Sequence, residues 1–173
     1  MNRSYFYRDI GEENMKKLLF TILASVLLLS ACGKMKTTDD LIKKARKEIP
    51  ISDAENTDIS FAGKCQNDSY SLLWFISGNE YQSHYYLPME CIEANGGYEF
   101  KQTFKPIDCG KDIAALQWHG YAFIINNKDC KTLKITDSSG VHNIEVSEYP
   151  FIWYNETMPS EYLFLDIDGN EIT

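Results

Sequence analysis

The residues of this sequence that could act as nucleophiles, proton carriers or metal ligands are dispersed, and their spacing matches no catalytic motif. The three histidines, His84, His119 and His142, fall on a predicted strand, a predicted turn and a second predicted strand. The sequence contains neither a Gly-x-Ser-x-Gly nucleophile elbow nor a His-Glu-x-x-His zinc motif. We therefore assign no catalytic residue, no metal ligand and no cofactor, and we expect a protein that is not an enzyme.

An acidic segment near the end of the sequence invites comparison with calcium-binding loops. It reads Asp166-Ile167-Asp168-Gly169-Asn170-Glu171. A complete calcium loop has the pattern Asp-x-Asp-x-Asp-Gly, which this segment does not supply. Asp-Gly is also a preferred dipeptide of two-residue hairpin turns. We expect a turn here and no metal site.

Aromatic residues make up 13% of the chain, and eleven of them are tyrosines. This is more than one small core is expected to hold, and amphipathic rings are good contact surfaces for sugars and proteins. One hypothesis is therefore an exposed recognition patch, and the alternative is a sheet packed on both faces. The candidate ligand-binding residues are Tyr85, Tyr86, Trp118, Trp153 and Tyr154.

The N-terminal part of the sequence has the features of an export signal. After Met15 come Lys16 and Lys17, then an apolar run from Leu18 to Leu29. The run has about a dozen residues, fewer than the ~20 of a membrane-spanning helix. A charged start, a short apolar stretch and small residues at its end are typical of a secretory signal peptide. We expect Met15 to be the start, and a long charged region from Met1 is the alternative.

The end of this signal, Leu29-Ser30-Ala31-Cys32, resembles the lipobox of bacterial lipoproteins. The resemblance implies cleavage before Cys32 and attachment of acyl chains such as palmitate to that residue. Two or three acyl chains give a stable anchor, because each buried CH₂ group contributes about 0.8 kcal/mol. We therefore expect residues 1–31 to be removed and 32–37 to form a lipid-anchored tether. Residues 38–173 would form one domain on the extracytoplasmic face of the cell membrane, or at the outer membrane in a Gram-negative host.

The other four cysteines, Cys65, Cys91, Cys109 and Cys130, form an even set. Their spacing is not that of a zinc site. In an exported chain we expect two disulfides, and pairing Cys65 with Cys91 and Cys109 with Cys130 would close the shortest loops. Each bridge would stabilise the fold by about 3 kcal/mol. Buried free thiols are the alternative.

The charge of the chain excludes one class of partner. Acidic residues outnumber basic residues 25 to 17, which gives a formal net charge of −8 at pH 7. Nucleic-acid binding requires a basic surface, so we expect no nucleic-acid partner. The membrane lipid, reached through the acyl chains on Cys32, and an extracellular protein or glycan are the expected partners.

The elements that must position these residues are one helix and many strands. Residues 38–49 have a helical apolar face of Leu41, Ile42, Ala45 and Ile49, and Pro50 ends the helix. Its basic face is either solvated or in contact with lipid headgroups. From about Asp58 onward, short apolar or alternating segments are separated by turn residues, which predicts strands. The segments are 70–76, 81–87, 98–104, 113–117, 121–125, 133–136, 141–146, 151–154 and 162–167.

This pattern predicts a mainly β fold, an antiparallel sandwich or barrel of nine or ten short strands with one short N-terminal helix. The body, notably Trp74-Phe75-Ile76-Ser77 and Tyr85-Tyr86-Leu87-Pro88, resembles small lipoproteins of Gram-positive gut bacteria. That resemblance implies a location and no chemistry. Our leading expectation is a non-enzymatic surface lipoprotein that binds a protein or glycan. A hydrolase of envelope polymers and an accessory subunit of a membrane complex are the alternatives.

Overall fold

The computed structural model describes residues 34–53, 55–78, 84–108 and 110–172. The chain divides into two units, Met1–Lys34 and Met35–Thr173, and apart from Lys34 all the elements described below belong to the second. The predicted signal peptide, the lipobox and Cys32 lie outside the described residues. Among the described residues, no helix has the length and apolar content that a membrane crossing requires.

The described residues form one helix, α2 (Thr38–Glu48), and three sheets. Sheet A has the strand order β1 (Lys34–Met35), β5 (Gly97–Thr103), β4 (Tyr85–Ala94), β3 (Ser71–Ser77) and β2 (Ile59–Gln66), with β6 (Ile107–Asp108) also paired to β4. Sheet B has the order β11 (Phe151–Asn155), β8 (Tyr121–Ile125) and β7 (Ile113–Gln117). Sheet C has the order β10 (Gly140–Glu145), β9 (Thr132–Asp137) and β12 (Glu161–Leu165).

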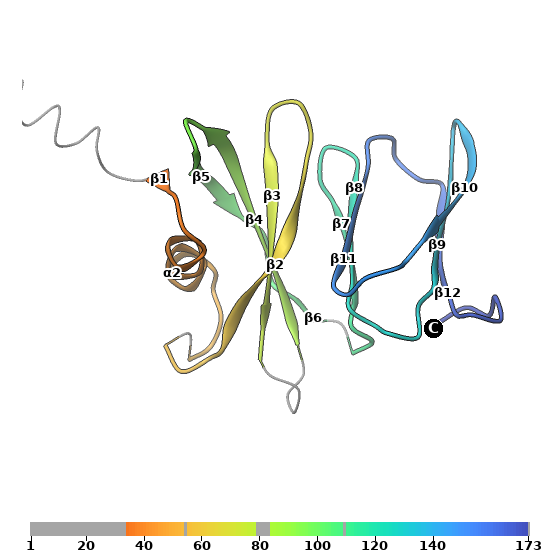
Figure 1. The fold of residues 1–173 in the computed structure, drawn as a ribbon, viewed down its shortest axis with the longest axis horizontal. Coiled ribbons are helices and arrows are strands. Elements are labelled where there is room, and N and C mark those ends of the chain that lie inside the picture. The colour runs from red at the N-terminus through yellow and green to blue at the C-terminus, as the bar shows by residue number, and fades with distance from the viewer. Residues whose placement is uncertain (1–33, 54, 79–83, 109, 173) are drawn as a thin grey trace, which may run out of the picture. The chain divides into compact units, whose positions relative to one another are not determined.

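These elements stack in the order helix, sheet A, sheet B, sheet C (Figure 1), so three separate cores lie between four layers. Between α2 and sheet A, Leu41 and Ala45 pack with Phe75 and Leu87. Between sheets A and B, the buried set includes Trp74, Tyr86, Ala122 and Ile124. Between sheets B and C it includes Phe123, Ile125, Leu133 and Ile135. The prediction of a mainly β, antiparallel fold with one short helix is confirmed.

Strands covered on both faces explain the continuous apolar runs of the sequence. Successive side chains of a strand point to opposite faces. On β8, Ala122 and Ile124 therefore face sheet A while Phe123 and Ile125 face sheet C. All seven residues of β3 are buried for the same reason. Full burial of each large apolar side chain contributes about 1.5–3 kcal/mol, so these two strands anchor the stack.

The helix begins with a capping box. The hydroxyl of Thr37 accepts a hydrogen bond from the backbone N–H of Asp40, and the Asp40 carboxylate accepts from the backbone N–H of Thr37. Part of the basic face docks the helix on the domain, because Arg46 donates to the carbonyl of Thr57 at 2.8 Å and Lys44 lies over the ring of Phe100. The predicted helix 38–49 thus ends one residue early, with Ile49 as its C-cap.

Three details of the prediction were wrong. The described residues contain twelve strands, and the nine listed segments omit three of them. β1 and β6 have only two residues each, and the pattern of β2 is interrupted by a register shift between Phe61 and Gly63. The strand predicted at 81–87 runs instead from Tyr85 to Ala94. The predicted tether 32–37 overlaps the domain, since Met35 is buried in the core beneath the helix.

The predicted Cys65–Cys91 disulfide is contradicted. Cys65, Cys91 and Cys130 are free thiols, and Cys109 lies outside the described residues. Cys65 on β2 faces sheet B and Cys91 on β4 faces the helix, so the two side chains leave opposite faces of sheet A and β3 runs between their strands. No bridge spans a sheet in this way, because disulfide geometry requires Cβ atoms about 4 Å apart.

We expect these three thiols to be slow to react in the folded protein. Burial raises the pKa of Cys65 and of Cys91 to about 12, and it also raises the pKa of Cys130, so little reactive thiolate is present near neutral pH. Iodoacetamide added without a reducing agent should label all three after denaturation and hardly label them before it. Peptide mass spectrometry measures both fractions, and a Cys65–Cys91 disulfide-linked peptide would contradict the structure.

Candidate functional site

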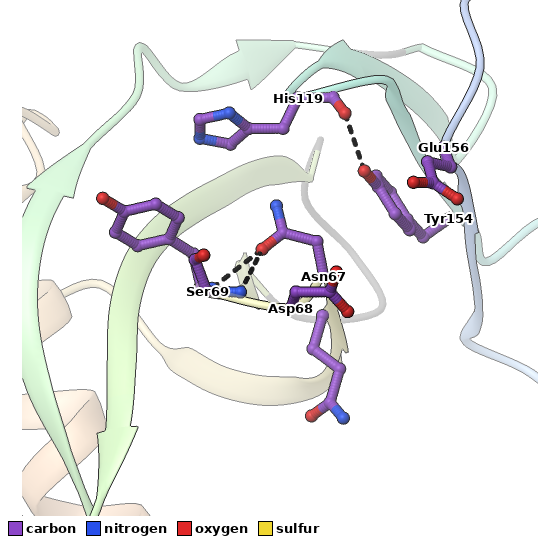
Figure 2. A pocket seen from close by; sticks show the side chains of 8 residues that line it. Asn67, Asp68, Ser69, His119, Tyr154 and Glu156 are labelled. Atoms are coloured by element: carbon purple, nitrogen blue, oxygen red, sulfur yellow. Dashed lines mark hydrogen bonds between the residues drawn. The ribbon is translucent and has the colours of Figure 1, made fainter.

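An open cleft lies at the end of the stack where several turns meet. It has a volume of about 640 Å³ and is lined by the β2–β3 turn (66–70), the β7–β8 turn at His119, and Tyr154 and Glu156 at the end of β11. We call it the loop-end cleft. Figure 2 shows that the side chains of these three segments lie around one opening. Ligand sites are concave openings of this size with a few polar groups.

The β7–β8 turn brings His119 to the cleft. His119 has a left-handed backbone conformation with φ 47°, and Gly120 follows with φ 137°. A side chain at Gly120 would place its Cβ 2.6 Å from the carbonyl oxygen of Glu156, so only glycine lets the turn approach the end of β11 this closely. The hydroxyl of Tyr154 donates to the carbonyl of His119 at 2.7 Å and fastens the two segments together (Figure 2).

The buried carboxylate of Glu90 also holds the β7–β8 turn in place. Glu90 on β4 is 4% exposed and accepts hydrogen bonds from Trp118 Nε1 at 2.7 Å and Gln102 Nε2 at 3.1 Å. His119 Nε2 lies 3.2 Å from the same carboxylate. A register shift between β4 and β5 places Gln102 opposite Glu90 and Phe100 opposite Cys91. Because a buried charge is costly unless it is satisfied, these contacts fix the position of Trp118 and His119.

The wall opposite Tyr154 is the β2–β3 turn. Asn67 Oδ1 accepts from the backbone N–H groups of Ser69 and Tyr70 at 2.9 and 2.8 Å, and its amide nitrogen points into the cleft (Figure 2). The Tyr70 ring is stacked on the His119 ring, with centroids 5.4 Å apart and planes within 6°. The turn therefore presents one flat ring and one amide in fixed positions.

The cleft is acidic. Asp68 and Glu156 line it, and among its described lining residues there is neither Lys nor Arg. Burial raises the pKa of Tyr154, and the charges of Glu156 and Asp68 act in the same direction, while hydrogen bonding with Asn67 opposes them. Both carboxylates are therefore close enough to act on one hydroxyl of the cleft wall. A neutral or cationic ligand suits this site better than an anion.

A second opening, of about 480 Å³, lies between β10 and β11. We call it the side cleft. It is lined by His142 and Ile144 on β10, by Trp153 on β11, and by Asp137 and Thr157 near its end. Glu156 lines both clefts.

Asp137 is the polar centre of the side cleft. Its Oδ1 accepts from the backbone N–H of Ser139 at 2.8 Å and from the Ser139 hydroxyl at 2.6 Å. Its Oδ2 accepts from Asn155 Nδ2 at 3.0 Å and from the hydroxyl of Thr157. Hydrogen bonds from Ser139, Thr157 and Asn155 hold the pKa of Asp137 far below its usual range. This carboxylate ties the β9–β10 turn to the segment that follows β11.

The same cluster contains a serine, a histidine and an aspartate, but it lacks the geometry of a catalytic triad. In a triad the aspartate and the serine bind different nitrogens of the histidine. Here Ser139 Oγ lies 2.8 Å and Asp137 Oδ1 3.3 Å from the same atom, His142 Nε2. The Ser139 proton is directed at the ionised Asp137 carboxylate, so His142 does not act as its base.

The predicted ligand-binding residues do not form one patch. Tyr86 and Trp118 are buried and hydrogen-bonded to Asp112 and Glu90, so neither is available to a ligand. Tyr85 lies at another opening beside Pro106, Trp153 lines the side cleft, and Tyr154 lines the loop-end cleft.

The remaining candidate residues, His84 and the acidic segment at Asp166, make local structural contacts. His84 Nδ1 lies 2.8 Å from Asp112. Asp166 accepts from the backbone N–H groups of Asp168 and Asn170, as expected for a turn. Within the described part of the chain, no group of three or more His, Cys, Asp or Glu side chains is placed to hold a metal ion.

The sequence analysis missed Glu90, Asn67, Asp68, Asp137 and Glu156. Glu90 had a readable signal, because it is a single acid in the apolar run from Tyr86 to Cys91. Asn67 and Asp137 had none, since polar residues beside turns are common and their partners lie far along the chain. No known protein family, no curated protein and no solved structure matches this chain.

We expect Asp137→Asn to lower the melting temperature, because the amide replaces one acceptor oxygen with a donor that faces other donors. Since the folded pKa lies below the unfolded value of about 3.9, the stabilisation is present above about pH 4 and is lost as the pH falls toward the folded value. The melting-temperature difference between wild type and variant should therefore be largest near neutral pH and shrink below about pH 4.

Calorimetry across this pH range measures the difference. Asp129→Asn is the matched control, because Asp129 is exposed and its carboxylate accepts no hydrogen bond found among the described residues. An Asp137→Asn effect that stays constant with pH would contradict the assignment of Asp137 as an ionised acceptor.

Proposed function

We propose that this protein is a non-enzymatic binding module whose loop-end cleft holds a glycan on the extracytoplasmic face of the membrane. The observation that carries the proposal is the composition of the cleft. It combines a flat tyrosine ring, amides and carboxylates in one open site of about 640 Å³.

This combination suits a sugar. A sugar ring has an apolar C–H face, which matches the stacked ring pair of Tyr70 and the half-exposed His119, and hydroxyls that both donate and accept hydrogen bonds. The amide of Asn67 and the carboxylates of Asp68 and Glu156 supply complementary partners at the cleft wall. The described lining residues contain no Lys or Arg to attract a phosphate or sulfate, so the proposal is for a neutral glycan.

The wall of the cleft is held in place before any ligand arrives. Glu90 fixes the Trp118–His119 turn, Tyr154 fastens it to β11, and Asn67 closes the β2–β3 turn on itself. A preorganised site loses less conformational entropy on binding, which favours recognition of a weakly binding ligand such as a sugar.

The location rests on the lipobox. Cleavage before Cys32 would leave this cysteine as the acylated first residue, and the acyl chains would hold the domain at the membrane. The net charge of −8 makes electrostatic attachment to an anionic membrane unfavourable, so the lipid is the proposed anchor.

The anchor is tested by metabolic labelling. Cells that express the wild-type chain should incorporate an alkyne-tagged palmitate into the protein, and Cys32→Ala should abolish the label and release the protein from the membrane fraction. Cys109→Ala is the matched control and should retain both the label and the membrane association. Equal labelling of wild type and Cys32→Ala would contradict the anchor.

A hydrolase of envelope polymers is the second candidate, and one observation favours it. The buried Glu90 carboxylate contacts Nε2 of His119, whose side chain is 50% exposed at the cleft. A carboxylate that orients a histidine is an arrangement found in general acid–base catalysis. The described cleft residues supply no activated nucleophile beside His119, so binding remains our conclusion.

The binding proposal predicts that the protein binds at least one of three neutral hexasaccharides, chitohexaose, cellohexaose and maltohexaose, in isothermal titration calorimetry. Asp68→Ala should weaken that binding about tenfold, because a hydrogen bond to a charged group contributes about 1.5 kcal/mol. Asp68 is exposed and accepts no hydrogen bond found in the described residues, so the variant should fold normally.

Asp129→Ala is the matched control and should bind like wild type. Binding of none of the three sugars at millimolar concentration would overturn the proposal. Mass spectrometry of the incubated sugars separates the two candidates. Unchanged hexasaccharide supports a binding module, whereas shortened products that disappear in His119→Ala would establish the hydrolase.

A further inference from the structure

Two adjacent residues of one strand line different clefts. Trp153 and Tyr154 follow each other on β11, and successive side chains of a strand leave opposite faces. Tyr154 lines the loop-end cleft and Trp153 lines the side cleft. Glu156, three residues after Trp153, lines both. The two clefts therefore meet at the end of β11.

The side cleft has the same kind of lining as the loop-end cleft. Trp153 is 36% exposed, and its ring is stacked on Phe151 with planes within 6°, so a flat indole is presented in a fixed orientation. The polar residues His142 and Thr157 line the cleft beside it. Its described lining residues also contain no Lys or Arg. An aromatic platform with polar neighbours thus occurs twice on one molecule.

Asp137 has a structural role in the side cleft and does not contact the ligand. Its two oxygens are already occupied by Ser139, Asn155 and Thr157, so they are not free for a ligand. It instead holds the β9–β10 turn and the segment after β11 together, which fixes the distance between the walls of the cleft. Trp153 and the exposed His142, which leaves β10 on the same face as Ile144, are side chains of this cleft that a ligand can contact.

We propose that the loop-end cleft and the side cleft are two subsites of one binding surface, and that this surface takes an extended neutral glycan chain. The inference rests on the proposed function and adds the mode of binding, in which one glycan chain extends across both clefts. Stacked sheets lie about 10 Å apart, and the two clefts lie on opposite sides of sheet B, so a chain of a few sugar units reaches both.

Two linked subsites make binding depend on chain length. When one end of a chain is bound, the other end is held near the second subsite at a high effective concentration, which raises the affinity by about a hundredfold or more. A disaccharide occupies one subsite at a time and gains nothing from the other. A hexasaccharide loses this advantage when either subsite is removed.

The test compares each hexasaccharide named above with its disaccharide, using calorimetry on the full chain in detergent micelles. The variants are Trp153→Ala and His142→Ala in the side cleft, Asp68→Ala in the loop-end cleft, the Asp68→Ala/Trp153→Ala double variant, and Asp129→Ala as the control. His142 is exposed on β10 and serves as the second side-cleft variant if Trp153→Ala unfolds. Circular dichroism checks folding.

Under the two-subsite arrangement, each single variant lowers hexasaccharide affinity at least tenfold toward that of the disaccharide, and the double variant loses less than the product of the two. The disaccharide affinity changes little in Trp153→Ala. Hexasaccharide binding that is weakened by Asp68→Ala but unaffected by both side-cleft variants would overturn the second subsite and leave the proposed function standing. Equal losses for disaccharide and hexasaccharide in Trp153→Ala would overturn the extended mode. Failure of every sugar to bind would overturn the proposed function itself.

Discussion

The candidate site depends on one buried charge. The Glu90 carboxylate lies between sheets A and B, where leaving it unpaired would cost several kcal/mol. Its contacts with Trp118, Gln102 and His119 come from two different sheets, so the charge joins β4 to the β7–β8 turn. The position of His119, and through it the stacking of Tyr70 and the hydrogen bond of Tyr154, follows from this contact.

Four layers explain the aromatic content that the sequence analysis assigned to a possible surface patch. A chain that folds into two layers has one core to fill, whereas this one has three. Phe75, Trp74 and Phe123 each fill a different core, and Tyr86 and Trp118 also use their polar atoms to satisfy buried or half-buried carboxylates. Most of the apparent excess is therefore structural, and Tyr85 and Trp153 are among the rings that remain exposed, Trp153 at the side cleft.

The fold was predictable from the sequence because its signals are local. Alternation and turn residues gave the strands near 113–117 and 121–125, and the first-turn acids and Pro50 gave the helix. The strand at Tyr85–Ala94 was misplaced because its apolar run lies on both faces and has no clear alternation at its start. The disulfide prediction failed because loop length carries no information about which face of a sheet a cysteine occupies.

The site was far less predictable than the fold. Its walls come from residues near 67, 119 and 156, and their spacing along the chain does not predict that they lie together. What joins them is tertiary structure, namely the order of the sheets and the close approach that Gly120 permits. Asn67, Asp68 and Glu156 are ordinary surface residues until that geometry is known.

The pairing of β11 with β8 has one more consequence. β11 is an edge strand of sheet B, and its antiparallel ladder sets Trp153 opposite Phe123 and Tyr154 opposite Ala122. A slip of that ladder by a single residue would turn every side chain of the strand to the other face. The indole and the phenol would then each face the other cleft. The register of this short ladder of backbone hydrogen bonds therefore decides which aromatic ring each cleft receives.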